Sequence, residues 1–333
     1  MYEKKSRRCC AAMLIVSVCL RLCMFLGLDD RLAQMAMAAI RAPETAQFLL
    51  FLETGRVFTP TPHLPRVTVV EEPPEEEPEP EPVTTASAAE ISVAGLCSYS
   101  FDKEALLARP TAMDLTVQGP KILIIHSHST EAYTQDDGLI YDEIPSYRTL
   151  DESRNVIAVG KVLAARLQEL GLAVIHDTGV YDYPDYNTSY YNSLQSITAW
   201  KEKYPSIQMV LDIHRDAVED EDGDAVALLG QYQGQSLARL MLVVGTDEGG
   251  LTHPNWQENL ANALKLQSVL QGQYPALCRK VDLRTERFNQ HATPGSLLIE
   301  VGTNGNTLTQ AKASAKLLAD AIADTLRLME AAG

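Results

Sequence analysis

The stretch KILIIHSH (121–128) is a short apolar run with high β propensity that ends in polar side chains. Such a run predicts a buried strand. Four further runs have the same character and are also predicted to be strands: LAVIHD (172–177), IQMVLDIH (207–214), ARLMLVVG (238–245) and SLLIEVG (296–302).

Helical periodicity fills the segments between these strands. The first predicted helix carries apolar residues at helical spacing: Val156, Val159, Leu163, Leu167 and Leu170. Ser153 is its expected N-cap, and Gly171 is expected to end it. Further helices are predicted at 191–203, 256–271 and 309–330. Strands that alternate with amphipathic helices predict an α/β fold, here a three-layer sandwich with a twisted mixed, largely parallel sheet flanked by helices.

Composition excludes two classes of protein. The 333 residues include 28 Lys+Arg and 44 Asp+Glu, a net charge of −16. We expect no nucleic-acid partner, because a phosphate backbone needs a basic face. Beyond the N-terminal stretch the only cysteines are Cys97 and Cys278, and no CxxC pair exists, which excludes a cysteine-ligated zinc ribbon. Two buried thiols are expected, with a Cys97–Cys278 disulfide as the alternative.

Residues 1–29 have the composition of a membrane anchor. A cationic flank that ends at Arg8 precedes an apolar run, 9–28, which is long enough to cross a bilayer and is interrupted by Arg21. No small-residue cleavage site follows cleanly, so an uncleaved signal anchor is predicted, with a cleaved signal peptide as the alternative. The rest of the chain is then extracytoplasmic.

Residues 30–95 are predicted to be an extracytoplasmic linker. It contains EEPPEEEPEPEP (71–82), whose prolines and mutually repelling charges favour an extended tether over a packed structure. The folded catalytic domain is therefore expected at 96–333.

Polar side chains with metal-binding or catalytic chemistry follow several predicted strands. In an α/β sandwich, the carboxyl ends of strands are where ligands bind. His128, Glu131 and the distant His214 supply two nitrogens and one carboxylate, a set that leaves a fourth position open on Zn²⁺. Glu300 comes from another strand and is the expected general base. An ion pair of Glu300 with Arg215 or Arg287 is the alternative.

Neighbouring residues have less direct roles. His126 is an alternate ligand or supports one, because strand alternation places it on the same face as His128. His176 is expected to be structural. Asp212 and Asp216 flank His214 and are candidates to orient a ligand imidazole.

Several long motifs carry a family resemblance: HSHSTEAY (126–133), SRNVIAVGKVL (153–163), VIHDTGVYDYPDYNTSY (174–190), DIHRDA (212–217), HPNWQENLANALKL (253–266) and RFNQHATPGSLLIEVGTNGNTLTQA (287–311). Together they resemble stage II sporulation protein P, over nearly all of 120–320. The resemblance implies a zinc-dependent N-acetylmuramoyl-L-alanine amidase with endopeptidase activity on peptidoglycan cross-links, acting in engulfment during endospore formation. It implies stage II sporulation proteins D and M as partners. It also implies a single-pass protein of the mother-cell membrane whose catalytic domain faces the intermembrane space.

The resemblance also carries residue roles. The histidines of the first motif, Glu131 and His214 match the metal-binding positions, and HxxE favours His128 over His126. Glu300 matches the catalytic glutamate, and the HxxE…H…E order also resembles that of zinc carboxypeptidases.

Five polar residues are expected to hold stem-peptide groups by charge-assisted bonds: Arg215, Arg287, Asn289, Gln290 and His291. An ordered surface loop is the alternative for 287–291. Two other functions are weighed: a non-catalytic wall-binding scaffold, which needs no metal ligands, and a zinc carboxypeptidase of peptides, which needs an arginine to clamp a terminal carboxylate.

Overall fold

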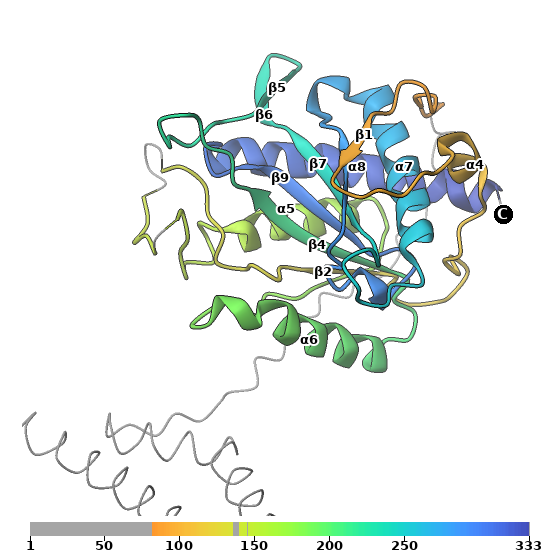
Figure 1. Cartoon of the computed structure of the whole chain (residues 1–333), viewed down its shortest axis with the longest axis horizontal. Coiled ribbons are helices and arrows are strands. Elements are labelled where there is room, and N and C mark those ends of the chain that lie inside the picture. Colours follow the sequence, from red (N-terminus) through yellow and green to blue (C-terminus); the bar gives the residue numbers. More distant parts are fainter. Residues whose placement is uncertain (1–81, 136–139, 145, 333) are drawn as a thin grey trace, which may run out of the picture. The chain divides into compact units, whose positions relative to one another are not determined.

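The computed structural model describes residues 82–135, 140–144 and 146–332 (Figure 1). All of them belong to one compact unit. The predicted anchor at 1–29 and the predicted linker up to residue 81 lie outside the described residues. Within the described part of the chain, no helix has the length and apolar character needed to cross a membrane.

A seven-stranded sheet forms the centre of the fold, in the order β1-β8-β7-β9-β4-β2-β3. Its strands are β1 (Val93–Gly95), β2 (Ile122–Ile125), β3 (Val174–His176), β4 (Met209–Asp216), β7 (Leu240–Gly245), β8 (Val281–Arg284) and β9 (Leu297–Thr303). Strands β3, β2, β4 and β9 are mutually parallel, β7 pairs antiparallel with β9, and β8 and β1 continue parallel to β7. A separate hairpin joins β5 (Leu229–Tyr232) to β6 (Gln235–Ala238). The predicted mixed, largely parallel sheet is confirmed.

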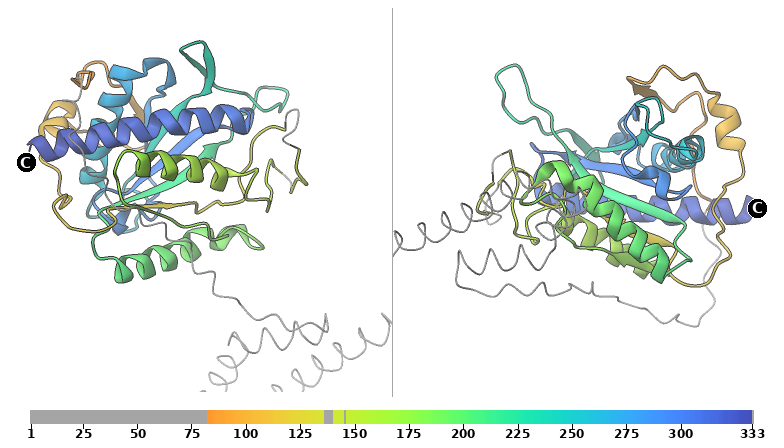
Figure 2. Two further views of the ribbon diagram at one scale, coloured as in Figure 1. Left: turned by 180° about the vertical axis from the view of Figure 1, so that it is seen from behind. Right: turned by 60° about the horizontal axis from the view of Figure 1, so that its bottom comes forward.

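Helices cover both faces of this sheet, which confirms the three-layer arrangement. One face carries α5 (Val156–Glu169), α7 (Trp256–Gln273) and α8 (Leu308–Ala332), which contribute to the main hydrophobic core. The views in Figure 2 show α5 and α8 side by side on this face. The other face carries α6 (Ser189–Lys203), which packs on a smaller core. The short α4 (Lys103–Ala108) packs against α7.

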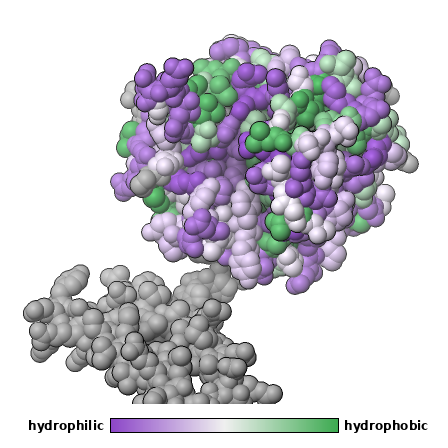
Figure 3. Space-filling view, in the orientation of Figure 1, coloured by the Kyte–Doolittle hydropathy of each residue, from purple (hydrophilic) through white to green (hydrophobic). Residues whose placement is uncertain are grey.

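Strand alternation decides which side chains meet α6. Leu123, Ile125 and Val210 pack with Ile197 and Trp200 on the α6 side, and the residues between them point into the main core. The surface in the orientation of Figure 1 is mostly hydrophilic, with apolar residues in scattered patches (Figure 3).

Two boundaries differ from the sequence prediction. Asn155, and not Ser153, caps α5, because the Asn155 side chain accepts a hydrogen bond from the Ile157 amide at 3.0 Å while the Ser153 hydroxyl donates to Asp151. The folded domain also begins before residue 96. Ile91 is fully buried, and β1 pairs with β8 at the edge of the sheet. The β1 sequence, VAG, contains one β-branched residue and no run of large apolar residues, which explains the error.

The two cysteines of the described residues, Cys97 and Cys278, are free thiols as expected, but only Cys278 is buried, and Cys97 is partly exposed.

Candidate metal centre

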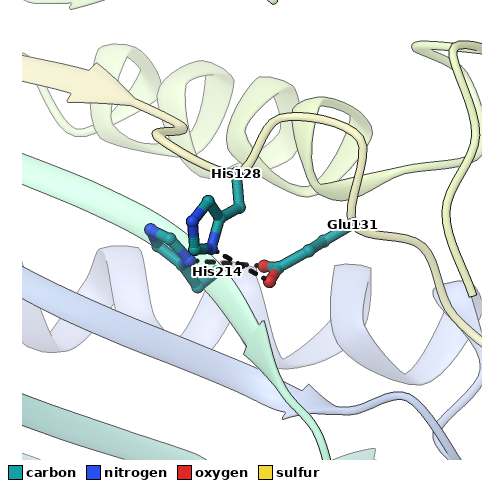
Figure 4. Close-up of side chains that lie close together, drawn as sticks. All are labelled: His128, Glu131 and His214. Atoms are coloured by element: carbon teal, nitrogen blue, oxygen red, sulfur yellow. Dashed lines mark ion pairs between the residues drawn. The ribbon is translucent and has the colours of Figure 1, made fainter. Parts of the chain in front are cut away.

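The centre is built where β2 and β4 end. Strand β2 stops at Ile125, and the chain then turns, with the Glu131 amide donating to the His128 carbonyl at 3.1 Å. This turn aims the side chains of His128 and Glu131 at His214 on β4 (Figure 4). All three are buried, and one ligand atom of each lies within 4.8 Å of the others. The predicted ligand set therefore converges in space.

Glu131 stands between the two imidazoles. Its Oε1 is 3.4 Å from His128 Nδ1, and its Oε2 is 3.3 Å from His214 Nδ1. The Arg215 backbone N–H donates to Oε2 at 3.1 Å, which fixes the carboxylate. Burial by itself raises the pKa of Glu131, but the nearby His214, His128 and Arg215 outweigh burial and hold that pKa well below the usual value.

His214 lies between two carboxylates. Its Nε2 is 2.9 Å from Asp212 Oδ1, and Glu131 lies on its Nδ1 side. Burial opposes the charged imidazole, yet Asp212 and Glu131 together raise the pKa of His214 well above its ordinary value. Two buried carboxylates thus favour positive charge at this spot. A divalent cation held by His128, Glu131 and His214 supplies such charge, so the residues present fit Zn²⁺ with one coordination position left for water or substrate.

Glu300 lies directly beside this cluster. It is the register partner of His214 on the adjacent parallel strand β9. Its Oε2 is buried and has no hydrogen-bond partner. Burial, reinforced by the charges of Glu131 and Asp216 and opposed by His214 and Arg215, raises the pKa of Glu300 to about 8.

The alternative ion pair of Glu300 is not formed. The Arg215 side chain donates to the carbonyl oxygens of Ala132, Ser146 and Tyr147, and Arg287 donates to the Thr252 carbonyl. Among the described side chains, no arginine lies within salt-bridge distance of Glu300. Its carboxyl group is therefore free for other chemistry.

An aromatic wall that the sequence analysis did not single out borders His128. The Tyr186 ring stacks on the imidazole with centroids 4.5 Å apart, and Tyr190 meets it edge-on at 5.3 Å. Arg148 lies over the Tyr186 ring at 4.7 Å and forms an ion pair with Asp182 at 2.7 Å. In the sequence, the tyrosine-rich stretch 181–191 is the feature that could have indicated this wall, but its spacing does not show which rings turn toward the centre.

His126 points away from the centre, contrary to the alternation argument. Its Nδ1 donates to the Ile213 carbonyl at 2.9 Å, and its Nε2 lies 2.9 Å from His176 Nε2. Burial lowers the pKa of His126 to about 4 and that of His176 to about 3. The alternation fails because β2 ends at Ile125, before either histidine. His176 has the structural position that the sequence analysis expected.

Of the five expected substrate-binding residues, three have their polar groups engaged inside the protein. Arg215 binds loop carbonyls as described above. Asn289 donates to the Tyr190 carbonyl at 2.7 Å, and Gln290 exchanges hydrogen bonds with Val243 and Gly245 of β7, both at 2.8 Å. Arg287 and His291 are partly exposed, and His291 lines a shallow hollow against α6. Only these two remain candidates to meet a substrate.

The fold and the cluster define an α/β protein that carries, at the carboxyl ends of its central strands, a buried His–Glu–His set suited to a divalent metal. Residues 66–323 match the family model of Stage II sporulation protein P. The match covers well over half of the chain, and the chain belongs to this family.

Other comparisons are more distant. No curated protein matches the chain in sequence. Among solved structures, the chain is similar to the N-acetylmuramoyl-L-alanine amidase AmiC2 of Nostoc punctiforme, with 12% identity, 63% of this chain and 97% of that chain covered, and a TM-score of 0.36. It is also similar to the CwlD amidase from Clostridioides difficile in complex with the GerS lipoprotein, with 16% identity, 64% and 100% covered, and a TM-score of 0.39. Identities this low do not transfer an activity, so the family assignment rests on the sequence match.

Proposed function

We propose that this protein is a zinc-dependent peptidoglycan hydrolase, an N-acetylmuramoyl-L-alanine amidase that also cleaves peptide cross-links, acting in engulfment during endospore formation. The observation that carries the proposal is the buried His128–Glu131–His214 set with the unpartnered carboxyl of Glu300 beside it. Membership of the stage II sporulation protein P family supports the substrate and the setting.

The three ligands would hold Zn²⁺ through His128 Nδ1, His214 Nδ1 and a Glu131 oxygen, the atoms that face one another. A zinc ion in such a site polarises the scissile carbonyl and makes a water molecule more acidic. Glu300 is the group that moves the proton. Its Oε2 accepts a proton from the attacking water and delivers it to the amine nitrogen as the C–N bond breaks. Burial raises the pKa of Glu300, which makes its carboxylate a better proton acceptor.

Surrounding residues would support the ligands and position the substrate. Tyr186 and Tyr190 pack against the His128 ring, and the Arg148 guanidinium lies 3.6 Å from Glu131 Oε1. Arg287 and His291 remain as groups for the carboxylates of a stem peptide.

We also propose a location and partners for the protein. The apolar segment within 1–29 would anchor the protein in the mother-cell membrane, with the catalytic domain in the intermembrane space. Stage II sporulation proteins D and M are the partners that family membership suggests.

Neither alternative function is favoured by a contact in the structure. A wall-binding scaffold has no use for a buried Glu300 carboxyl that lacks a partner, because such a group costs stability. A carboxypeptidase needs a free arginine clamp at the metal, but Arg215 donates to backbone carbonyls and Arg148 is paired with Asp182.

Digestion of purified sacculi with the full-length, zinc-loaded protein tests the proposal. Mass spectrometry of the released fragments identifies the new termini. New N-terminal L-alanine amines report the amidase, and new cross-bridge termini report the endopeptidase. A folded, zinc-loaded protein that releases neither would overturn the assignment.

A further inference from the structure

Asp212 holds the two histidine-bearing segments of the centre together. It sits on β4 two residues before His214, and it is the register partner of Ile125, the last residue of β2. Its Oδ1 accepts the Ser127 backbone N–H at 2.8 Å, and its Oδ2 accepts the Ser127 hydroxyl at 2.6 Å. Ser127 immediately precedes His128, so one buried carboxylate fixes the start of the turn that carries this ligand.

The same carboxylate determines the tautomer of His214. Nε2 lies 2.9 Å from Asp212 Oδ1 and 2.9 Å from Ser127 Oγ. The carboxylate only accepts hydrogen bonds, and the hydroxyl hydrogen of Ser127 is already donated to Asp212. Both neighbours of Nε2 are therefore acceptors, which requires the ring hydrogen to be on Nε2. In the neutral ring, the form that binds a metal, the lone pair is then on Nδ1, the atom that faces Glu131.

We propose that Asp212 is a positioning residue for both histidine ligands. It fixes His214 with its hydrogen on Nε2 and its metal-binding lone pair on Nδ1. Through its hydrogen bonds to Ser127 it also holds the adjacent His128 in place relative to β4. This inference rests on the proposed zinc site. A carboxylate behind a ligand imidazole also makes the ligating nitrogen more basic, which strengthens its bond to a metal.

Zinc affinity of the full-length protein, measured by chelator competition at fixed pH, tests the role of Asp212. Asp212→Asn keeps the size of the side chain but removes its charge and one acceptor. Its zinc affinity should fall ten- to a hundredfold, the range typical of a group that orients a metal ligand. Ser127→Ala removes the hydroxyl contacts to Asp212 and His214 but keeps the Asp212 carboxylate against the imidazole, so it should weaken zinc binding less than Asp212→Asn does.

Asp177→Asn is the matched control. Asp177 is an equally buried carboxylate at the end of β3, and it accepts hydrogen bonds from Gly179, Tyr181 and Trp200 but from no residue of the metal cluster. This variant should lose thermal stability and bind zinc as the unmodified protein does. A purely structural role of Asp212 would make the two aspartate variants behave alike.

A spectroscopic measurement on the unmodified protein decides the matter even if Asp212→Asn does not fold. ¹⁵N shifts of the histidine rings in the zinc-loaded protein should show His214 bound through Nδ1 and protonated on Nε2. Metal on Nε2 would overturn the inference, and so would an Asp212→Asn variant that folds and binds zinc within twofold of the unmodified protein. Failure of the unmodified protein to bind zinc would contradict the proposed function itself, which is a separate result.

Discussion

His214 and Glu300 are direct register partners on the adjacent parallel strands β4 and β9, so their side chains leave the sheet on the same face. One is a candidate metal ligand, and the other is the candidate base. Both are mounted on central strands of the sheet, where the backbone is held by hydrogen bonds on both sides. Rigid elements place reacting groups more reproducibly than loops do, which is what metal-assisted hydrolysis requires.

Replacing Glu300 by glutamine should separate catalysis from metal binding. Glu300→Gln keeps the shape of the side chain but cannot accept a proton, so turnover on sacculi should fall by roughly 10²–10⁴, or ~3–5 kcal/mol in barrier. Zinc content should stay the same, since Glu300 is not among the proposed ligands. Thermal stability should not fall, because the Glu300 carboxyl forms no ion pair. Turnover and melting are measured on one preparation.

The exposed Glu219 supplies a control for this experiment. Glu219→Gln makes the same chemical change outside the centre and should keep full turnover. Near-normal turnover of folded, zinc-loaded Glu300→Gln would rule out the general-base role.

Removal of a ligand should act on the metal itself. His214→Ala leaves two protein ligands, and zinc content should drop to near zero while circular dichroism shows the fold retained. The loss should exceed the ten- to hundredfold effect expected for Asp212→Asn, because a coordinating atom is removed and not only its support. Stoichiometric zinc in purified His214→Ala would exclude His214 as a ligand.

Much of this arrangement could be predicted from the sequence, because central strands made of consecutive apolar residues leave clear patterns. β2, β4 and β9 are such strands, and the rule that ligands gather at strand ends placed His128, Glu131 and His214 together. The edge strand β1 (VAG) and its neighbour β8 (VDLR) contain no run of large apolar residues, so the sequence pattern did not reveal them.

The errors have a common physical origin, which is local geometry that a sequence pattern does not contain. His126 was placed on the wrong side because the turn after Ile125 breaks the alternation of the strand. Asn289 and Gln290 looked free to bind a substrate, but their amide groups satisfy backbone groups of α6 and β7. Buried polar side chains of this kind are engaged by partners distant in sequence, which no short motif reveals.

Membrane anchoring is a prediction for the segment 1–29. Fractionation of sporulating cells that carry a C-terminal tag should recover the full-length protein in membranes, because the cationic flank and apolar run suit an uncleaved anchor. N-terminal sequencing of the recovered protein provides the check. A soluble mature form that begins near residue 30 would show that the segment is a cleaved signal peptide.

The His126–His176 pair explains a glycine in the middle of α5. A Cβ on Gly160 would lie 2.5 Å from His126 Nε2 and 2.7 Å from His176 Nε2, too close for either ring to stay in place. Gly160→Ala should therefore destabilise the protein by about 1–3 kcal/mol, despite the better helix propensity of alanine. Urea unfolding measures the change.

A double-mutant cycle identifies the cause of this loss. His126→Ala removes the ring that the new methyl group meets, so the double variant should be more stable than the sum of the two single effects predicts. Strict additivity would mean that contact with His126 is not the source of the strain. His126→Ala should also retain zinc, because His126 lies outside the cluster.

Acid should destabilise the fold through His253, which lies away from the metal centre. Burial, with help from His291 and Arg287, lowers the pKa of His253 to about 4. Between the unfolded value, about 6.5, and about 4, the unfolded chain binds a proton that the folded protein does not. Stability is therefore fully present above pH 6.5 and falls as the pH drops toward 4, by at most about 1.4 kcal/mol per pH unit for this group.

His253→Gln cannot titrate, so the free energy of unfolding should fall less steeply below pH 6.5 than in the unmodified protein. Above pH 7 the difference between the two proteins should be constant, which provides an internal control. Parallel curves from pH 8 to pH 4.5 would show that His253 takes up its proton equally in both states.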